Sequence, residues 1–175
     1  MPIKIIFLDR DGVINAEVGY LFKIQNFKFI DGVFEACVNF LQLGYKIIIV
    51  SNQSGISRGY YTESDYQKLT QWMLTQFNKN GVGILDTFHC PHSIEADCNC
   101  RKPKPGMFNE AATRYNIDLE KSWMIGDKET DITAANLAGV SKTILVRSGH
   151  KIEEPKSKAM FFLNSIHESE NIIKH

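Results

Sequence analysis

The sequence predicts an α/β fold in which a mainly parallel sheet carries helices on both faces. Short apolar, β-branched segments alternate with segments whose apolar residues recur at helical spacing, which is typical of such folds. The first apolar segment, 3–8, is nearly continuous, as expected for a strand buried on both faces. Polar residues cluster directly after several expected strands, where open α/β sheets bind their ligands.

The first half of the chain supplies well-marked helix boundaries. Apolar residues recur at helical spacing over 31–43, and a glycine follows where helices commonly end. A second buried strand is expected at 45–50. Thr62 and Asp65 then have the spacing of a capping box, with Asp in place of the usual Glu, and predict a helix that runs to about residue 80.

The second half of the chain repeats the alternation of strands and helices. We expect strands at 84–88, 122–125, 142–146 and 159–163, helices at 106–115 and 132–138, and a terminal helix after the last strand. Strands that alternate with helices in this way form a Rossmann-like parallel sheet, because each crossover returns the chain to the same edge.

Length and composition fit one globular domain. The chain has 175 residues, of which 43% are hydrophobic, enough to fill a core. Twenty basic residues balance twenty acidic ones, so we expect no nucleic-acid partner. No apolar run reaches the roughly 20 residues of a membrane helix, and the N-terminal stretch lacks the features of a signal peptide. We therefore expect a cytoplasmic, monomeric, single-domain protein over 1–175, with no membrane partner.

Three polar clusters follow expected strands, at 9–11, 51–53 and 126–128. The carboxyl ends of parallel strands meet at one edge, so these clusters should converge there. Asp9 and Asp11 repel each other unless a cation or a proton lies between them. Mg²⁺ takes one or two carboxylates together with substrate phosphate. One carboxylate can then attack phosphorus while a second protonates the leaving oxygen and later activates water.

Each cluster also has a simpler interpretation. An isolated Asp-x-Asp pair equally well caps a turn. Ser51 offers a hydroxyl, and the backbone after it offers N–H donors for phosphate oxygens, but the segment also reads as an ordinary glycine-containing turn. Arg101 and Lys102 precede an expected helix, where Lys102 could neutralise a phosphate or the pair could simply be solvated.

Three cysteines and a histidine lie within eleven residues: Cys90, His92, Cys98 and Cys100. A Cys₃His set suits a closed, tetrahedral, structural zinc site. The alternative is a chance grouping of cysteines beside an unrelated histidine. A zinc loop at 89–101 would lead directly into Lys102 and fix its register. The remaining cysteine, Cys37, lies on an apolar helix face and is expected in the core.

Four motifs together resemble the haloacid dehalogenase superfamily of phosphohydrolases: FLDRDG at 7–12, VSNQSG at 50–55, the Lys102 segment, and IGDKETD at 125–131. They occur in the order found in that superfamily. About forty residues separate Asp9 from Ser51, and a loop and a helix already use them. The resemblance therefore implies a capless member, and an open site favours hydrolysis over a mutase reaction.

The resemblance also implies roles for individual residues. Asp9 would be the nucleophile and Asp11 the general acid and base, while Ser51 and Lys102 would hold the phosphoryl group. Catalytic Mg²⁺ would be held by the side chains of Asp9 and Asp127 and by the backbone carbonyl of Asp11. Asp131 is expected outside the site, where it orients Lys128 or metal-bound water.

The zinc loop followed by CRKPKPGM at 100–107 narrows the resemblance to two groups, the heptose-bisphosphate phosphatases and the histidinol phosphatases. The segments at 19–33, 52–63 and 145–149 are more similar to the first group. That resemblance implies removal of the C7 phosphate of a heptose bisphosphate, on the route to ADP- or GDP-heptose for lipopolysaccharide or surface polysaccharide. Histidinol phosphate stays open as the alternative substrate, because Glu17 could pair with its cationic group.

A bisphosphate needs cationic recognition beyond the transferred group. Arg101 offers a planar fork for the distant phosphate, and Lys128 adds charge near the metal. The remaining expected substrate contacts are Glu17, Val18, Gly19 and Tyr20 around the sugar, and Asn52, Gln53 and Ser54 at hydroxyls or phosphate. For these loop residues the alternative is plain loop packing. A zinc-loop binding module without turnover is a further alternative, which magnesium-dependent hydrolysis would exclude.

Overall fold

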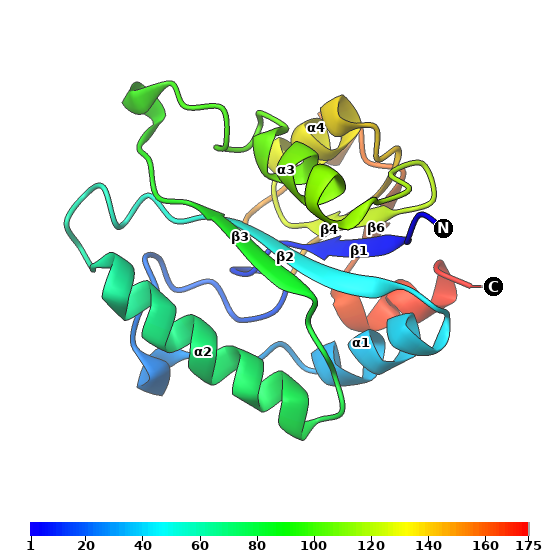
Figure 1. Ribbon diagram of the computed structural model, residues 1–175, viewed down its shortest axis with the longest axis horizontal. Helices are drawn as coiled ribbons and strands as arrows, with labels where there is room; N and C mark the ends of the chain where they lie inside the picture. The colour runs from blue at the N-terminus through cyan, green and yellow to red at the C-terminus, as the bar shows by residue number, and fades with distance from the viewer. Residues whose placement is uncertain (175) are drawn as a thin grey trace.

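The computed structural model, which describes residues 1–174, contains a six-stranded sheet in the order β3-β2-β1-β4-β5-β6 (Figure 1). Every neighbouring pair of strands is parallel. The strands are β1 (Ile5–Leu8), β2 (Lys46–Asn52), β3 (Asp86–Cys90), β4 (Trp123–Gly126), β5 (Lys142–Val146) and β6 (Phe161–Leu163). The expected parallel α/β architecture is confirmed. Position 175 of the expected single domain lies outside the described residues.

Four α-helices cover the two faces of the sheet (Figure 1). They are α1 (Val33–Gln42), α2 (Glu63–Lys79), α3 (Gly106–Tyr115) and α4 (Glu129–Ala138). One core lies between the sheet, α1 and α2, and the other lies between the sheet, α3 and α4. Short 3₁₀ segments complete the structure: η1 (Ile24–Asn26), η2 (Ile94–Ala96), η3 (Glu154–Lys156) and η4 (Ile166–Asn171).

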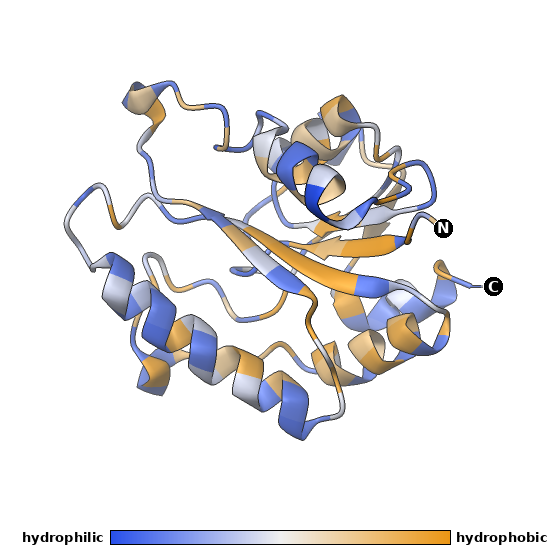
Figure 2. Cartoon of the chain, viewed as in Figure 1, coloured by the Kyte–Doolittle hydropathy of each residue, from blue (hydrophilic) through white to orange (hydrophobic). Residues whose placement is uncertain are grey.

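Strand β1 contributes to both cores. Ile6 and Leu8 point into the core beneath α1 and α2, whereas Ile5 and Phe7 point into the core beneath α3 and α4. All four residues are fully buried. Figure 2 shows the same contrast, with apolar central strands and helices that turn polar residues outward. The nearly continuous apolar run at the start of the chain therefore reflects a strand with no exposed face.

Helix α2 begins as the sequence predicts. The Thr62 hydroxyl accepts a hydrogen bond from the Asp65 backbone N–H at 3.1 Å, and the Asp65 carboxylate accepts one from the Thr62 N–H at 2.9 Å. This reciprocal capping box satisfies two N–H groups that the first turn leaves unpaired. The helix ends at Lys79 with Asn80 as its C-cap, which agrees with the expected end.

Other boundaries differ in ways that matter for the site. Helix α3 and strand β5 occupy their predicted ranges, but α4 begins at Glu129, three residues before the expected start at 132. The earlier start follows from Asp131, whose carboxylate accepts the Lys128 N–H and caps the first turn. The expected terminal helix is instead the 3₁₀ segment η4, which packs against α1.

The chain between β1 and α1, 9–32, contains only the short η1 segment. No inserted domain is present there, as expected for a capless fold. Within residues 1–174, the structure contains no helix with the length and apolar character needed to cross a membrane.

Replacement of Thr62 by Ala should destabilise the protein by about 1 kcal/mol, because one N–H of the first turn of α2 loses its acceptor. Urea unfolding followed by circular dichroism measures the change. Thr75→Ala is the matched control, since the Thr75 hydroxyl bonds only to the Gln71 carbonyl within the same helix. Equal stability of Thr62→Ala and wild type would contradict the assigned cap.

Candidate active site

A cavity of roughly 390 Å³ lies at the carboxyl ends of β1, β2 and β4. Each of the three predicted polar clusters contributes to it, through Asp9, Asn52 and Lys128 among others. The expected site residues that line the cavity are Asp9, Asp11, Glu17, Gly19, Tyr20, Asn52, Gln53, Ser54, Arg101, Lys102 and Lys128. Three expected residues do not line it: Val18 is exposed, while Ser51 and Asp127 are buried.

Lys102 is the buried cation of this site, with a side chain only 2% exposed. Its Nζ lies 3.0 Å from Asp9 Oδ1 and 2.6 Å from Asp131 Oδ1. It also donates to the Val50 carbonyl at 2.7 Å. Burial opposes the charged ammonium, but Asp131 and Asp9 outweigh burial and raise the pKa of Lys102 above its ordinary value. The side chain is therefore a fixed positive charge.

The backbone of Lys102 is held by one side-chain amide. Asn52 Nδ2 donates to the Lys102 carbonyl, and Asn52 Oδ1 accepts the Lys102 N–H, each at 3.0 Å. Asn52 lies at the end of β2, so the amide ties Lys102 to the sheet edge. Both of its polar ends are engaged within the protein, and the amide serves to place Lys102.

Asp9, Asp127 and Asp131 form a cluster whose nearest carboxylate oxygens all lie within 4.8 Å of one another. Burial, followed by the charge of Asp131, raises the pKa of Asp9 well above its ordinary value. Burial and Asp131 likewise raise the pKa of Asp127 to about 6. Asp127 Oδ1 is buried without a hydrogen-bond partner among the described residues. The cluster offers carboxylate oxygens as ligands and carries more negative than positive charge, so it fits a hard divalent cation.

Asp11 has different surroundings, because cationic and amide donors face its carboxylate. The buried Arg10 guanidinium contacts both of its oxygens at 3.0 to 3.3 Å. Asn15 and Gln53 donate to it at 3.0 and 3.1 Å. Burial alone would raise the pKa of Asp11, but Arg10 and these hydrogen bonds outweigh burial and lower it below the ordinary value. Asp9 and Asp11, two residues apart, therefore differ in proton affinity.

Gln53 connects Asp11 with Ser51. Its Nε2 donates to Ser51 Oγ as well as to Asp11 Oδ2. Its Oε1 accepts from the Tyr61 hydroxyl and from Arg10 Nη2. The Gln53 amide is thus engaged at both ends, like that of Asn52, and it orients the hydroxyl and the carboxylate on either side of it.

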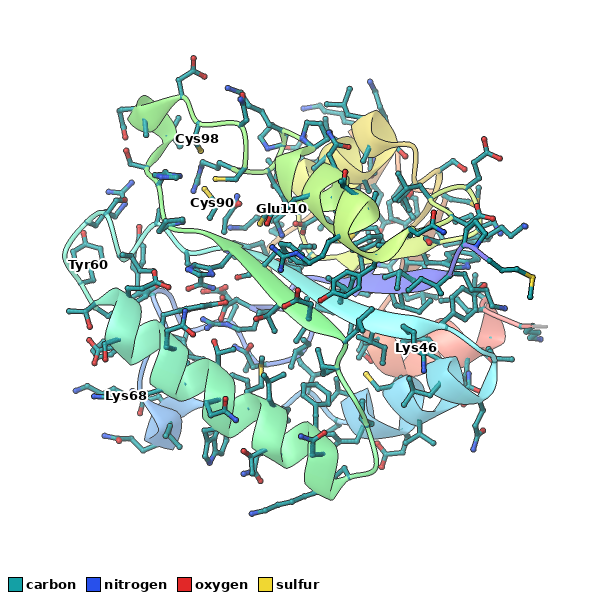
Figure 3. The ribbon with its side chains drawn as sticks, in the orientation of Figure 1. Lys46, Tyr60, Lys68, Cys90, Cys98 and Glu110 are labelled. Atoms are coloured by element: carbon teal, nitrogen blue, oxygen red, sulfur yellow. The ribbon has the colours of Figure 1, made fainter. Side chains whose placement is uncertain are left out.

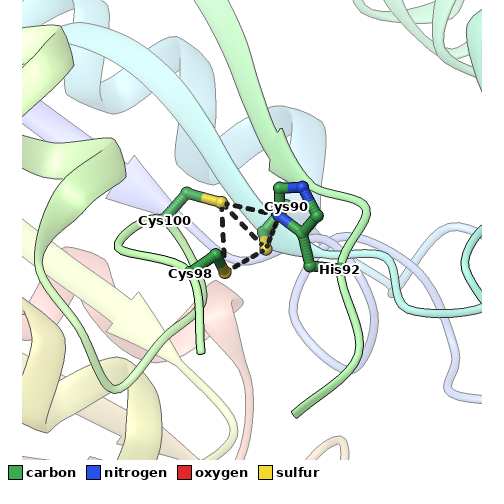
Figure 4. A group of neighbouring side chains, drawn as sticks. All are labelled: Cys90, His92, Cys98 and Cys100. Atoms are coloured by element: carbon green, nitrogen blue, oxygen red, sulfur yellow. Dashed lines mark hydrogen bonds between the residues drawn. The ribbon is translucent and has the colours of Figure 1, made fainter. Parts of the chain in front are cut away.

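The predicted cysteine and histidine group comes together in space (Figure 4). Cys90 ends β3, and Cys98 lies on the loop beyond it (Figure 3). Cys100 Sγ lies 3.0 Å from Cys90 Sγ, 3.5 Å from Cys98 Sγ and 3.3 Å from His92 Nδ1. Zinc–sulfur bonds of about 2.3 Å in a tetrahedron place the sulfurs roughly 3.8 Å apart. The four ligand atoms therefore fit a closed zinc site, while Cys37 is buried in α1 as expected.

The cysteine loop is tied to the cavity. Arg101 directly follows Cys100, lines the cavity, and donates from Nη1 to the His92 carbonyl at 3.3 Å. A metal that fixed His92 and Cys100 would fix the course of the chain on both sides of this contact. Lys102 comes next, so the loop and the buried cation share one short stretch of backbone.

The structure confirms one expected contact of Asp131, with Lys128, and adds a second, with Lys102. Its Oδ1 pairs with Lys102, and its Oδ2 accepts the backbone N–H groups of Asp127 and Lys128 at 3.1 Å. It holds the Lys128 backbone, as the sequence predicts, and it also pairs with the Lys102 side chain and lines the cavity. Asp131 lies four residues after Asp127, in the first turn of α4, and this spacing could have placed it beside the site from the sequence.

Five further residues that line the cavity were not predicted as site residues: Leu21, Arg58, Tyr61, Thr130 and His150. His150 contacts the Asp127 carboxylate, with Nδ1 2.6 Å from Oδ2. It lies in the loop after β5, and the carboxyl end of that strand belongs to the same sheet edge. The position of His150 after that strand could have identified it as a site residue from the sequence. Arg58 and Tyr61 reach the cavity only through tertiary packing.

Comparison with known proteins finds relatives that are named for the same reaction. A family model described as "HAD-hyrolase-like" matches residues 99–169. The chain is 46% identical to the D-glycero-alpha-D-manno-heptose-1,7-bisphosphate 7-phosphatase of Photorhabdus laumondii, over 93% of this chain and 92% of the relative. It is 47% identical to the D-glycero-beta-D-manno-heptose-1,7-bisphosphate 7-phosphatase of Vibrio cholerae, over 92% and 91%.

A solved structure agrees with these relatives. The D,D-heptose 1.7-bisphosphate phosphatase from B. bronchiseptica, crystallised as a complex with magnesium and phosphate, superposes with a TM-score of 0.82 at 28% identity. The match covers 94% of each chain. The similarity therefore extends over nearly the whole length of both chains.

The buried acidic cluster should cost stability when no cation is bound. Because the pKa of Asp127 rises from 3.8 to about 6 on folding, its ionisation opposes folding by on the order of 3 kcal/mol. In magnesium-free buffer above pH 7, Asp127→Asn should therefore be more stable than wild type by about that amount. The difference should shrink as pH falls from 6 to 4, where the wild-type carboxyl becomes protonated. Chemical unfolding at pH 5 and pH 8 measures it, and a destabilised variant at pH 8 would contradict the prediction.

Proposed function

Because this chain belongs to the heptose-1,7-bisphosphate 7-phosphatase family of the haloacid dehalogenase-like hydrolases, we propose that it hydrolyses the C7 phosphate of D-glycero-D-manno-heptose 1,7-bisphosphate. The observation that carries the proposal is the buried pair of Asp9 and Lys102 at the sheet edge, in a chain 46% and 47% identical to relatives named for this reaction. The product would feed the synthesis of nucleotide-activated heptose.

In the proposed reaction Asp9 is the nucleophile. One of its carboxylate oxygens attacks phosphorus, the bond between phosphorus and the C7 oxygen breaks, and an aspartyl-phosphate forms. Asp11 would enter this step protonated, because the negative charge of the bound substrate opposes the effect of Arg10 on its pKa, and would donate that proton to the departing C7 oxygen. Water then attacks the phosphoryl group, Asp11 takes a proton from that water, and Asp9 is released with inorganic phosphate. The hydrogen bonds from Arg10, Asn15 and Gln53 support the ionised Asp11 that the second step requires.

Lys102 and Ser51 would hold the phosphoryl oxygens. The Lys102 ammonium lies within 3.0 Å of Asp9 Oδ1, so a phosphoryl group that approaches Asp9 also meets a positive charge. Preplaced charge of this kind favours a transition state that spreads negative charge over phosphoryl oxygens. Gln53 orients the Ser51 hydroxyl for the same purpose.

The acidic cluster would hold Mg²⁺ through the side chains of Asp9 and Asp127 and the backbone carbonyl of Asp11. The unpartnered Asp127 Oδ1 and the raised pKa of Asp9 support a cation at this place. When bound, Mg²⁺ would offset the negative charge of the carboxylates and the phosphoryl group. Asp131 would act from outside, through Lys102 and the backbone of Asp127.

The Cys₃His group would hold structural zinc, which has no open position and takes no part in the chemistry. Its role would be to order a loop that has little core of its own, and thereby to place Arg101 and Lys102. Arg101 would bind the phosphate that is not transferred, as a planar fork. Lys128 would add positive charge near the metal, and the loop at 17–20 would lie along the sugar.

The decisive experiment is phosphate release by the purified protein with Mg²⁺. Both C1 anomers of the heptose bisphosphate are compared with histidinol phosphate, and positional analysis identifies the phosphate removed. We expect one phosphate, from C7, per heptose. Asp9→Asn should lower kcat by at least about 10⁴-fold, because the amide is no nucleophile, with unchanged circular dichroism. Preference for histidinol phosphate, or turnover by Asp9→Asn, would refute the proposal.

Loss of zinc should weaken substrate binding more than chemistry. Cys98→Ser should carry less than one zinc per chain, melt at lower temperature, and show a raised KM for the bisphosphate because Arg101 loses its support at His92. A simple monophosphate ester, which does not need Arg101, should be affected less. Cys37→Ala, which removes a cysteine outside the group, should keep its zinc. A zinc-free Cys98→Ser with wild-type KM and melting temperature would exclude this role.

A further inference from the structure

The loop after β5 closes over one of the proposed magnesium ligands. We call residues 148–150 the clasp. The Ser148 hydroxyl donates to the Gly12 carbonyl at 2.7 Å, which ties the clasp to the loop that carries Asp9 and Asp11. The next residue packs directly on the Asp127 carboxylate. The clasp therefore joins the ends of β1, β4 and β5 around a single side chain.

Two glycines allow this close approach. A Cβ atom built on Gly149 would lie 2.1 Å from Asp127 Oδ2, and one built on Gly12 would lie 2.3 Å from the same oxygen. Real Cβ atoms do not approach other atoms so closely, so any side chain at either position would displace the carboxylate. The backbone thus confines Asp127 from two sides.

The two oxygens of Asp127 have unequal surroundings. Oδ2 accepts the His150 backbone N–H at 2.9 Å and faces His150 Nδ1 at 2.6 Å. Oδ1 is buried and has no partner among the described residues. A carboxylate held by two donors on one oxygen has a fixed orientation, and its other oxygen points where the protein directs it.

We propose that His150 is a positioning residue that fixes the Asp127 carboxylate through Oδ2 and so presents Oδ1 to the catalytic Mg²⁺. This inference rests on the metal site of the proposed function. The Nδ1–H group of a neutral imidazole is a sufficient donor, so the role requires no charge on His150. Partners that orient a metal ligand commonly change metal affinity by about 10- to 100-fold when they are removed.

The position of His150 separates this role from general support of the fold. Its side chain is 39% exposed and lines the cavity, whereas Asp127 beneath it is fully buried. Truncation of a half-exposed side chain leaves no large cavity in the core. The backbone N–H of residue 150 also remains available to Oδ2 in every variant. Loss of the imidazole should therefore act on the metal and leave the fold in place.

Magnesium binding by the full-length protein tests the proposal. Isothermal titration with MgCl₂ should give a dissociation constant at least about tenfold higher for His150→Ala and His150→Leu than for wild type. His150→Asn should stay within about threefold of wild type, because its Nδ2–H group can take the place of Nδ1–H. Lys151→Ala, an exposed neighbour outside the catalytic cavity, is the matched control and should bind like wild type.

A kinetic measurement separates positioning from substrate contact. The Mg²⁺ concentration for half-maximal phosphate release should rise in His150→Ala in parallel with the dissociation constant. The KM for the sugar phosphate at saturating Mg²⁺ should stay at its wild-type value. Zinc content and melting temperature confirm that each variant is folded. If His150→Ala unfolds, the comparison of His150→Leu with His150→Asn still tests the proposal.

Wild-type Mg²⁺ affinity in His150→Ala or His150→Leu would overturn the inference and leave the proposed function intact. A loss in His150→Asn as large as that in His150→Leu would also overturn it, because the hydrogen bond would then not be the cause. Failure of the wild-type protein to bind Mg²⁺ would instead refute the metal site of the proposed function, and this inference with it.

Discussion

The structure depends on one electrostatic constraint: four charged groups are withdrawn from water at the edge of the sheet. Lys102 lies between Asp9 and Asp131, and Asp127 completes the cluster. One ammonium cannot balance three carboxylates, and buried charge without a partner is costly. The cluster therefore calls for a further cation and favours an anionic ligand only once that cation is present. This imbalance links the proposed metal and phosphate sites to the fold.

The surrounding elements serve to keep this cluster in place. The Asn52 amide fixes the backbone of Lys102, and the cysteine loop leads into it from the other side. Gln53 joins Ser51 to Asp11, while the clasp holds Asp127. Lys102, Asp11 and Asp127 are thus each positioned by a neighbour at or just beyond the end of a strand. Such preorganisation lowers the cost of reorientation when charge develops on a reacting phosphoryl group.

Much of the architecture and many of the site residues could be predicted because their signals are local in sequence. A capping box, the helical spacing over 106–115 and the continuous strand at the N-terminus depend on neighbours a few residues away. The sequence predicts a terminal helix but not its 3₁₀ form, which depends on packing against α1. The sequence does not predict the contact of Asp131 with Lys102 or that of His150 with Asp127, because in each case the partner lies on another element.

The sequence by itself determined the parallel sheet, the edge at which polar residues gather, and the identity of the aspartates, the lysine and the cysteine group. The sheet and its polar edge follow from hydrophobic periodicity and from the rule that parallel strands end together. The aspartates and the lysine follow from motifs that resemble the haloacid dehalogenase superfamily, and the cysteine group follows from its ligand types and spacing. Only the tertiary structure decided which atom faces which: that Asn52 and Gln53 bind protein groups, that Asp131 pairs with Lys102, and that His150 occupies one oxygen of Asp127. The reason is physical, because a hydrogen bond depends on distance and direction in space, which residue spacing along the chain does not specify.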